Sequence, residues 1–204
     1  MTPDAVRRVA ARGAFLAALV LVVVLAAQQR SLRAQYADLA RRFREPSAGM
    51  YVPTFRASTL AGDSLTVGRS AAGGREVLIA FTTECPYCRA SVPLWQRLAA
   101  AVDTIHAPVR LVGISLSAAD STRAYVAEHA FHFPVVRFPE AKLKYLYRMQ
   151  VVPVTAVLDS AGRVLYAHVG AVTDTAIQDS VLAAVRSQPP PAAPKVGSVR
   201  PGGN

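Results

Sequence analysis

The apolar residues divide this chain into two regions. One long apolar run lies near the N-terminus, and a series of shorter apolar runs follows further along. Residues 13–27 hold no charged side chain, and this run is slightly shorter than most membrane-spanning helices. Residues 9–11 extend it if the Arg12 side chain reaches back to the membrane surface. The pattern predicts a transmembrane anchor over residues 13–27, preceded by a basic cytoplasmic segment over residues 1–12.

A cleaved signal peptide is the alternative interpretation of the same run. Val24-Leu25-Ala26 supplies a small-residue cleavage site, and the run has the length of a signal sequence. Against cleavage, residues 28–45 continue with apolar side chains at helical spacing, namely Leu32, Tyr36, Leu39 and Phe43. This continuation favours an uncleaved anchor followed by a helical stalk. Under both interpretations the remainder of the chain lies outside the cytoplasm.

Beyond the stalk, apolar runs of strand length alternate with segments whose apolar side chains recur at helical spacing. Strands are expected over residues 77–81, 109–115, 133–136, 154–158 and 163–166, and helices from residue 86 and over 119–129, 140–149 and 173–186. Two further short strands flank a turn at residues 61–63. This order predicts one α/β domain over residues 46–187, with helices packed on a central mixed sheet. The Pro- and Gly-rich residues 188–204 are expected to be a disordered tail.

Composition and charge narrow the function of this domain. The chain has 204 residues, 52% of them apolar, which is enough for one sizeable core. Of the net charge of +10, most lies outside the domain: residues 1–44 hold eight arginines and two aspartates, whereas residues 50–185 hold twelve basic and ten acidic side chains. A protein that binds nucleic acid concentrates basic residues on a folded face. The distribution therefore argues against nucleic acid as a partner.

The chain holds two cysteines, which are three residues apart in the sequence Cys85-Pro86-Tyr87-Cys88. They follow a buried-strand run and open a predicted helix, with Pro86 suited to its first turn. The positive end of a helix favours a thiolate on Cys85, and Cys88, one turn on, can attack a mixed disulfide formed there. The spacing predicts thiol–disulfide exchange through a redox-active Cys85–Cys88 disulfide, with no other cofactor.

Structural and metal-binding interpretations of the cysteine pair are weaker. A structural disulfide that closes so short a loop would contribute roughly 2 kcal/mol, which is little for a domain with its own core. A zinc site needs four ligands, and the sequence has no second C-x-x-C or paired-histidine motif. Covalent haem attachment needs a histidine after the second cysteine, where Arg89 stands. Redox chemistry is the interpretation that fits best.

From about residue 50 to residue 186, the chain resembles the membrane-anchored thioredoxin-like oxidoreductases of the TlpA/ResA type. The matching segments are, in order, residues 52–55 with 60–63, residues 77–88, Pro93, residues 133–135, and residues 151–155 with 158–159 and 162–164. The resemblance implies a thioredoxin-like fold in which the Val152–Pro153 peptide bond is cis and lies opposite the cysteines. Backbone groups of this loop would then meet an incoming polypeptide.

The chain departs from this family beside the cysteines. Glu84 stands where the family usually has Trp, and Ser91 stands where ResA-like proteins carry a Glu. A carboxylate at Glu84 opposes a thiolate on Cys85, so Glu84 is either a solvent-side base or a carboxylate that the helix dipole favours. Tyr87 is expected to be exposed beside the site. The Pro-Tyr pair matches glutaredoxins, whose potentials are intermediate, and leaves the direction of electron transfer open.

The expected function is thiol–disulfide exchange on the periplasmic or extracellular side of a bacterial cytoplasmic membrane. The partners would be protein thiols or disulfides, with a membrane electron donor if the protein is a reductase. Two alternatives stay open. Thr82 stands three residues before Cys85, as a threonine does in the T-x-x-C motif of peroxiredoxin-like peroxidases. A copper-delivery module would bind Cu(I) through the dithiol, with Met149 or His168 nearby if folding brings either close.

Overall fold

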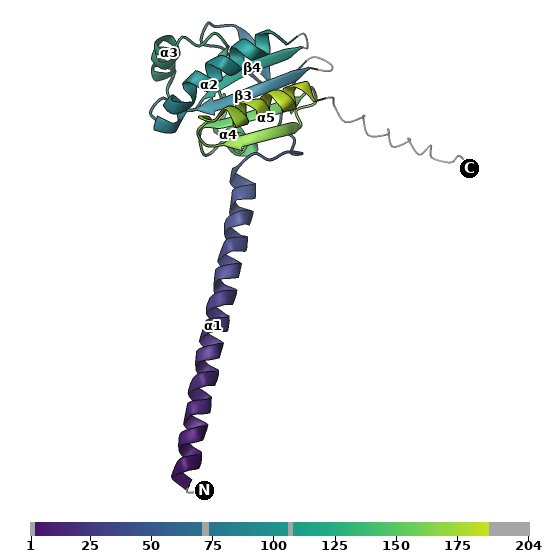
Figure 1. Ribbon diagram of the computed structural model, residues 1–204. Coiled ribbons are helices and arrows are strands. Elements are labelled where there is room, and N and C mark those ends of the chain that lie inside the picture. The colour runs from purple at the N-terminus through teal and green to yellow at the C-terminus, as the bar shows by residue number, and fades with distance from the viewer. Residues whose placement is uncertain (1–2, 71–73, 106–107, 188–204) are drawn as a thin grey trace, which may run out of the picture. The chain divides into compact units, whose positions relative to one another are not determined.

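The protein is described from a computed structural model that covers residues 3–70, 74–105 and 108–187 (Figure 1). The tail expected over residues 188–204 lies outside these described residues. The chain divides into two units, with the division between Phe43 and Arg44.

The described residues of the first unit all belong to one helix, α1 (Pro3–Arg44), whose last residue is the first of the second unit. Its segment Phe15–Ala40 is long and apolar enough to cross a membrane, and the side chains of that segment are exposed. The residues predicted as anchor and those predicted as stalk, apart from Glu45, belong to one uninterrupted helix. An apolar helix at this place fits a membrane anchor or a signal sequence.

A five-stranded mixed sheet forms the centre of the second unit, with strand order β5-β4-β3-β6-β7. The strands are β3 (Arg75–Phe81), β4 (Val109–Ser115), β5 (Val135–Arg137), β6 (Val154–Asp159) and β7 (Val164–Val169). β4 is parallel to β3 and β5, whereas β6 is antiparallel to β3 and β7. A separate antiparallel hairpin consists of β1 (Phe55–Ser58) and β2 (Ser64–Val67). The predicted α/β fold with a mixed sheet is confirmed.

The central strand β3 is buried along its whole length because both faces of the sheet are covered. Alternate residues of a strand point to opposite faces. Val77, Ile79 and Phe81 therefore join one core, and Leu78 and Ala80 join the other. The sheet thus separates two hydrophobic cores.

Different helices cover these two cores. The first core contains Cys88 and side chains from α2 (Pro86–Asp103), α5 (Thr175–Arg186) and α3 (Ala119–Glu128). We call this side the cysteine face. The second core contains side chains from the β1–β2 hairpin and from α4 (Ala141–Leu146). We call that side the hairpin face.

The helix predicted over residues 140–149 is wrong at its carboxyl end, because α4 stops at Leu146. Arg148 has a φ of +53°, in the left-handed region, where helical geometry ends. Tyr147 and Met149 on either side of it are buried in the core of the hairpin face. The Tyr147 hydroxyl donates a hydrogen bond of 2.6 Å to the Pro53 carbonyl oxygen. Packing of these two side chains overrides the helical spacing.

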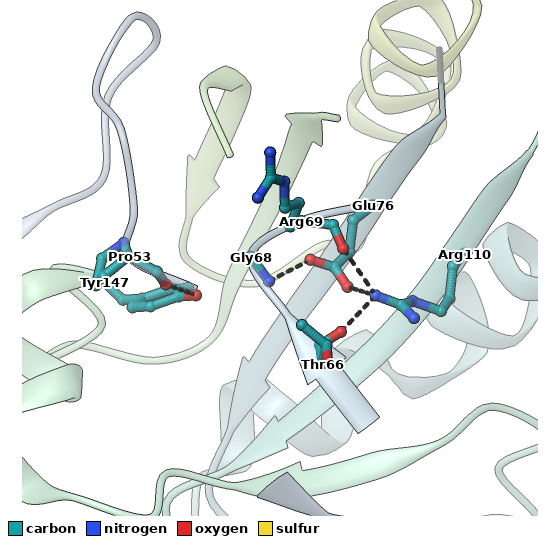
Figure 2. A network of polar contacts seen from close by, with 7 residues as sticks. All are labelled: Pro53, Thr66, Gly68, Arg69, Glu76, Arg110 and Tyr147. Atoms are coloured by element: carbon teal, nitrogen blue, oxygen red, sulfur yellow. Dashed lines mark hydrogen bonds and ion pairs between the residues drawn. The ribbon is translucent and has the colours of Figure 1, made fainter. Parts of the chain in front are cut away.

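A polar network at the start of β3 holds the hairpin against the sheet (Figure 2). The Glu76 carboxyl group is fully buried and accepts hydrogen bonds from the Gly68 N–H, at 2.7 Å, and from Arg110 Nη2. The same nitrogen donates to the carbonyl oxygens of Thr66, at 2.6 Å, and Arg69, at 3.3 Å. Burial raises the pKa of Glu76, and the hydrogen bond and charge of Arg110 act against this rise. The network lies at the opposite end of β3 from the cysteines.

Candidate active site

The first turn of α2 carries both cysteines. Cys85 is the N-cap residue with extended backbone angles, and Pro86 is the first helical residue, a position where the missing N–H of proline does no harm. The N–H groups of Cys88 and Arg89 both donate to the Cys85 carbonyl oxygen, at 3.1 Å. The helix therefore begins where the sequence predicted.

The two sulfur atoms have different surroundings. Both cysteines are free thiols; Cys85 is partly exposed, and Cys88 is fully buried in the core of the cysteine face. Burial raises the pKa of Cys88 to about 12, with a further contribution from the hydrogen bond and charge of Cys85. A hydrogen bond with the Thr82 backbone acts in the opposite direction. Cys88 is thus a neutral thiol at physiological pH, and Cys85 is the accessible one.

The loop before β6 lies next to Cys85. β6 runs antiparallel to β3, with Val154 opposite Ala80, so the start of β6 lies beside the end of β3 that leads to the cysteines. The Val152–Pro153 bond is cis, as the resemblance implied. Cys85 Sγ lies 3.8 Å from the Val152 carbonyl oxygen, to which the thiol donates. The fold therefore brings together Cys85 and the loop that the sequence singled out.

Hydroxyl groups hold the Glu84 carboxylate beside the cysteines. Glu84 Oε1 accepts from Thr83 Oγ1 at 2.6 Å, and Oε2 accepts from Ser117 Oγ at 3.0 Å. These hydrogen bonds, the one from Thr83 first, lower the pKa of Glu84. A carboxylate with a lowered pKa is a weak base, which does not favour the solvent-side base among the two predicted roles. Sequence reasoning missed Ser117, which follows β4 and is distant from Glu84 in the chain.

Ser91 ties α2 to the segment before α5. Its hydroxyl donates to the Tyr87 carbonyl oxygen at 2.7 Å and accepts from the Val172 N–H at 2.8 Å. These contacts give Ser91 a structural role at the position where ResA-like proteins have Glu. The Tyr87 side chain is 65% exposed, so its predicted position at the surface is confirmed.

A buried tyrosine on α3 lies in the same core as Cys88. Tyr125 is 3% exposed and stacks on Phe81, with ring centroids 5.5 Å apart. Its hydroxyl has no hydrogen-bond partner among the described residues. Burial, with a smaller contribution from Cys88, raises the pKa of Tyr125 to about 12. No sequence motif marks this residue, because it is one apolar-face position of an ordinary helix.

The described residues do not include a cluster of three or more His, Cys, Asp and Glu side chains able to hold a metal. Met149, one of the two residues considered as a copper ligand, is buried in the core of the hairpin face, across the sheet from Cys88. The ring of His168, the other residue, is 3.4 Å from the Ala171 carbonyl oxygen. The position of Met149 therefore argues against this residue as a copper ligand beside the cysteines.

Residues 47–185, more than half of the chain, match the Redoxin family. Two curated relatives are both named methylamine utilization protein MauD. The protein from Methylobacillus flagellatus is 30% identical, over 74% of this chain and 72% of its own length. The one from Methylophilus methylotrophus is 28% identical, over 75% and 71%.

Solved structures share the fold at lower identity. StoA from Bacillus subtilis has a TM-score of 0.54 and 20% identity, over 63% of this chain and 96% of StoA. A secreted disulfide oxidoreductase of Mycobacterium tuberculosis, homologous to E. coli DsbE, has a TM-score of 0.52 and 23% identity, over 64% and 93%. At these identities the likeness shows the thioredoxin-like fold alone. With the family match, it follows that the chain belongs to the redoxin family and is a thioredoxin-like thiol–disulfide oxidoreductase.

Proposed function

We propose that this protein is a membrane-anchored, extracytoplasmic oxidoreductase that uses Cys85-Pro86-Tyr87-Cys88 to reduce or exchange disulfides in polypeptide substrates, called clients below. The observation that carries the proposal is the unequal placement of the two sulfur atoms. Cys85 is partly exposed at the start of α2, whereas Cys88 is buried in the core. A client disulfide can therefore reach Cys85 first.

In the first step, the Cys85 thiolate attacks one sulfur of the client disulfide. A Cys85–client disulfide forms, the client S–S bond breaks, and the other client sulfur leaves as a thiolate that takes a proton from solvent. The Val152 carbonyl oxygen and the cis bond to Pro153 lie beside Cys85, where backbone groups can bind an extended client chain. Exposed Tyr87 adds apolar surface next to the same cysteine.

In the second step, Cys88 attacks the Cys85 sulfur. The Cys85–Cys88 disulfide forms and the client leaves as a second thiol, so two electrons pass from the dithiol to the client. Cys88 must first lose its proton, which burial opposes. The hydrogen bond and charge of Cys85 also raise the pKa of Cys88, and both are lost when Cys85 enters the mixed disulfide. The resolving thiolate therefore forms more easily once a client is attached.

Glu84 places a negative charge beside the cysteines. Hydrogen bonds from Thr83 and Ser117 lower its pKa and keep the carboxylate ionised, next in sequence to Cys85. If the protein works as a reductase, a membrane electron donor would be needed to restore the dithiol.

The organisation of the chain fits such a function. We assign residues 13–27 as the anchor, residues 28–45 as the stalk and residues 46–187 as the catalytic domain. The apolar segment of α1 supports insertion in a bacterial cytoplasmic membrane. The domain would then work on the periplasmic or extracellular side, where client disulfides form and persist.

Insulin reduction by the full chain in detergent micelles, with dithiothreitol as electron source, tests the proposal. The wild type is expected to accelerate insulin precipitation above the dithiothreitol background, and Cys85→Ser to return the rate to background. Folded wild-type protein that gives no acceleration would contradict the proposal. Rapid formation of sulfenic acid on Cys85 with micromolar peroxide would instead support the peroxidase alternative, to which Thr82 points.

A further inference from the structure

A surface pocket of about 280 Å³ lies at the carboxyl ends of β4 and β5. It is lined by Ser115, Leu116, Arg137, Phe138, Ala141 and Lys144. Its volume is close to that of small ligand sites in proteins. The Phe138 ring packs against Phe55 and Tyr147, with centroid distances of 5.3 Å to each. The pocket therefore combines a fixed aromatic wall with two cationic side chains.

The lining of this pocket is positively charged. Arg137 and Lys144 are its charged side chains, and neither forms an ion pair with a carboxylate among the described residues. Lys144 Nζ lies 5.3 Å from the centroid of the Tyr145 ring, a contact that leaves its charge uncompensated. The neighbouring acid, Glu140, is already paired with Lys142 at 2.6 Å. An anionic group entering from outside would complement the pocket.

The pocket lies at the same edge of the sheet as the cysteines. Phe81, Ser115 and Arg137 are aligned across the parallel strands β3, β4 and β5, and Cys85 follows four residues after Phe81. The Leu116 N–H donates to the Phe81 carbonyl oxygen at 2.9 Å. Neighbouring strands are about 4.8 Å apart, so Arg137 is roughly 10 Å from Phe81 across two strands. One wall of the pocket is thus bonded to the segment that leads to Cys85.

We propose that this pocket is a subsite for an acidic side chain of the client polypeptide. The proposal rests on the function proposed above and adds a substrate class to it. An extended chain spans about 3.3 Å per residue. A client whose cysteine is bonded to Cys85 would therefore place a residue roughly three to five positions away in the pocket. There a carboxylate would lie between Arg137 and Lys144, with its methylene groups against Phe138.

Matched disulfide peptides test this subsite on the full chain in micelles. The peptides differ only in Glu, Gln or Lys at the fourth position from the reactive cysteine. The wild type is expected to reduce the Glu peptide with a kcat/KM about tenfold above that for the Lys peptide, the combined effect of two partly exposed ion pairs. The preference should weaken as salt rises from low to high concentration.

Two variants separate the pocket from general surface charge. The double change Arg137→Gln and Lys144→Gln is expected to remove the preference and leave the rate on the Gln peptide within about twofold. Arg97→Gln, at an exposed arginine of α2 outside the pocket lining, should keep the preference. Equal rates on the Glu and Lys peptides in the wild type, or a preference that survives the double change, would overturn the subsite alone. No reduction of any peptide by the wild type would overturn the proposed function and the subsite with it.

Discussion

Cys88 on one face of the sheet and Glu76 on the other are both buried ionisable groups, and their surroundings differ. On the cysteine face, Cys88 is fully buried among apolar side chains such as Val92 and Trp95. On the hairpin face, Glu76 is equally buried, but Arg110 and the Gly68 N–H contact its carboxyl oxygens. Burial raises the pKa of both groups. Only Glu76 has a cationic partner among the residues described.

This difference shows how one small domain separates stability from chemistry. The contacts of Glu76 join the hairpin to the sheet and do not depend on the state of the cysteines. The ionisation of Cys88 depends on Cys85, because the hydrogen bond and charge of Cys85 contribute to its raised pKa. The fixed network lies at one end of β3, and the responsive thiol follows the other end.

The largest expected effect concerns the reactivity of Cys88. In a Cys85→Ser variant, iodoacetamide should alkylate Cys88 more than about a hundredfold more slowly than free cysteine at pH 8. Burial, the largest cause of the raised pKa of Cys88, persists in this variant, although the contribution of Cys85 is lost. The thiolate fraction should grow with pH, so the rate should still rise between pH 8 and pH 10 without a plateau. Alkylation followed by mass spectrometry measures both. After unfolding in guanidinium, Cys88 should react like free cysteine. A reaction as fast as this in the folded protein would show that burial does not suppress the ionisation of Cys88.

The second effect concerns the stability of the hairpin face. Glu76→Ala leaves the Gly68 N–H and Arg110 without their buried acceptor. Because the Arg110 side chain is 34% exposed, the free energy of unfolding should fall by about 2–3 kcal/mol. Guanidinium unfolding followed by the fluorescence of Trp95, the one tryptophan in the chain, measures this change. Insulin reduction per folded molecule should stay within about twofold of wild type, because the network is remote from the cysteines. Glu128→Ala, at a side chain 63% exposed, is the control and should change stability by less than about 0.5 kcal/mol. A similar loss in both variants would contradict the role of the network.

The third effect, a smaller loss of stability, concerns the close approach of Gly68 to Pro53 and Tyr147. Gly68 has a φ of +86°, and a Cβ added there would lie 2.8 Å from the Pro53 carbonyl oxygen and in contact with the Tyr147 hydroxyl. Gly62 also has a positive φ, of +97°, but its Cβ would meet nothing within 4 Å. Gly68→Ala should therefore lower the free energy of unfolding by about 1–2 kcal/mol more than Gly62→Ala. Equal losses in guanidinium unfolding would show that the backbone angle, and not packing, requires glycine.

Much of the fold could be predicted because local signals agreed with tertiary packing. The apolar run before Cys85 is a central strand, and Pro86 stands at the first turn of the helix, so the end of the strand and the start of the helix follow from the sequence. The end of α4 could not be predicted in this way. Tyr147 and Met149 continue the helical spacing, but both side chains are buried in the core of the hairpin face. Arg148 between them adopts a left-handed backbone conformation, which ends the helix.

The candidate site could likewise be predicted only in part. The cysteine spacing and the cis bond before Pro153 could be predicted from a motif and a family resemblance. The hydroxyl contacts of Glu84 could not, because Ser117 is 33 residues away in the chain and only the pairing of β3 with β4 brings the two together. Tyr125 and the cationic pocket at Arg137 also depend on tertiary contacts, which no local pattern encodes.

The proposed mechanism requires Cys85 to attack the client and Cys88 to complete the reaction. Trapping tests it most directly: Cys88→Ser and Cys85→Ser variants of the full chain are each mixed with a client peptide that contains a disulfide, and the adducts are mapped by mass spectrometry. We predict that Cys88→Ser accumulates one client per chain, bonded to Cys85, and that Cys85→Ser accumulates almost none. An adduct on Cys88 that forms as fast in Cys85→Ser as the Cys85 adduct does in Cys88→Ser would rule out these separate roles for the two cysteines.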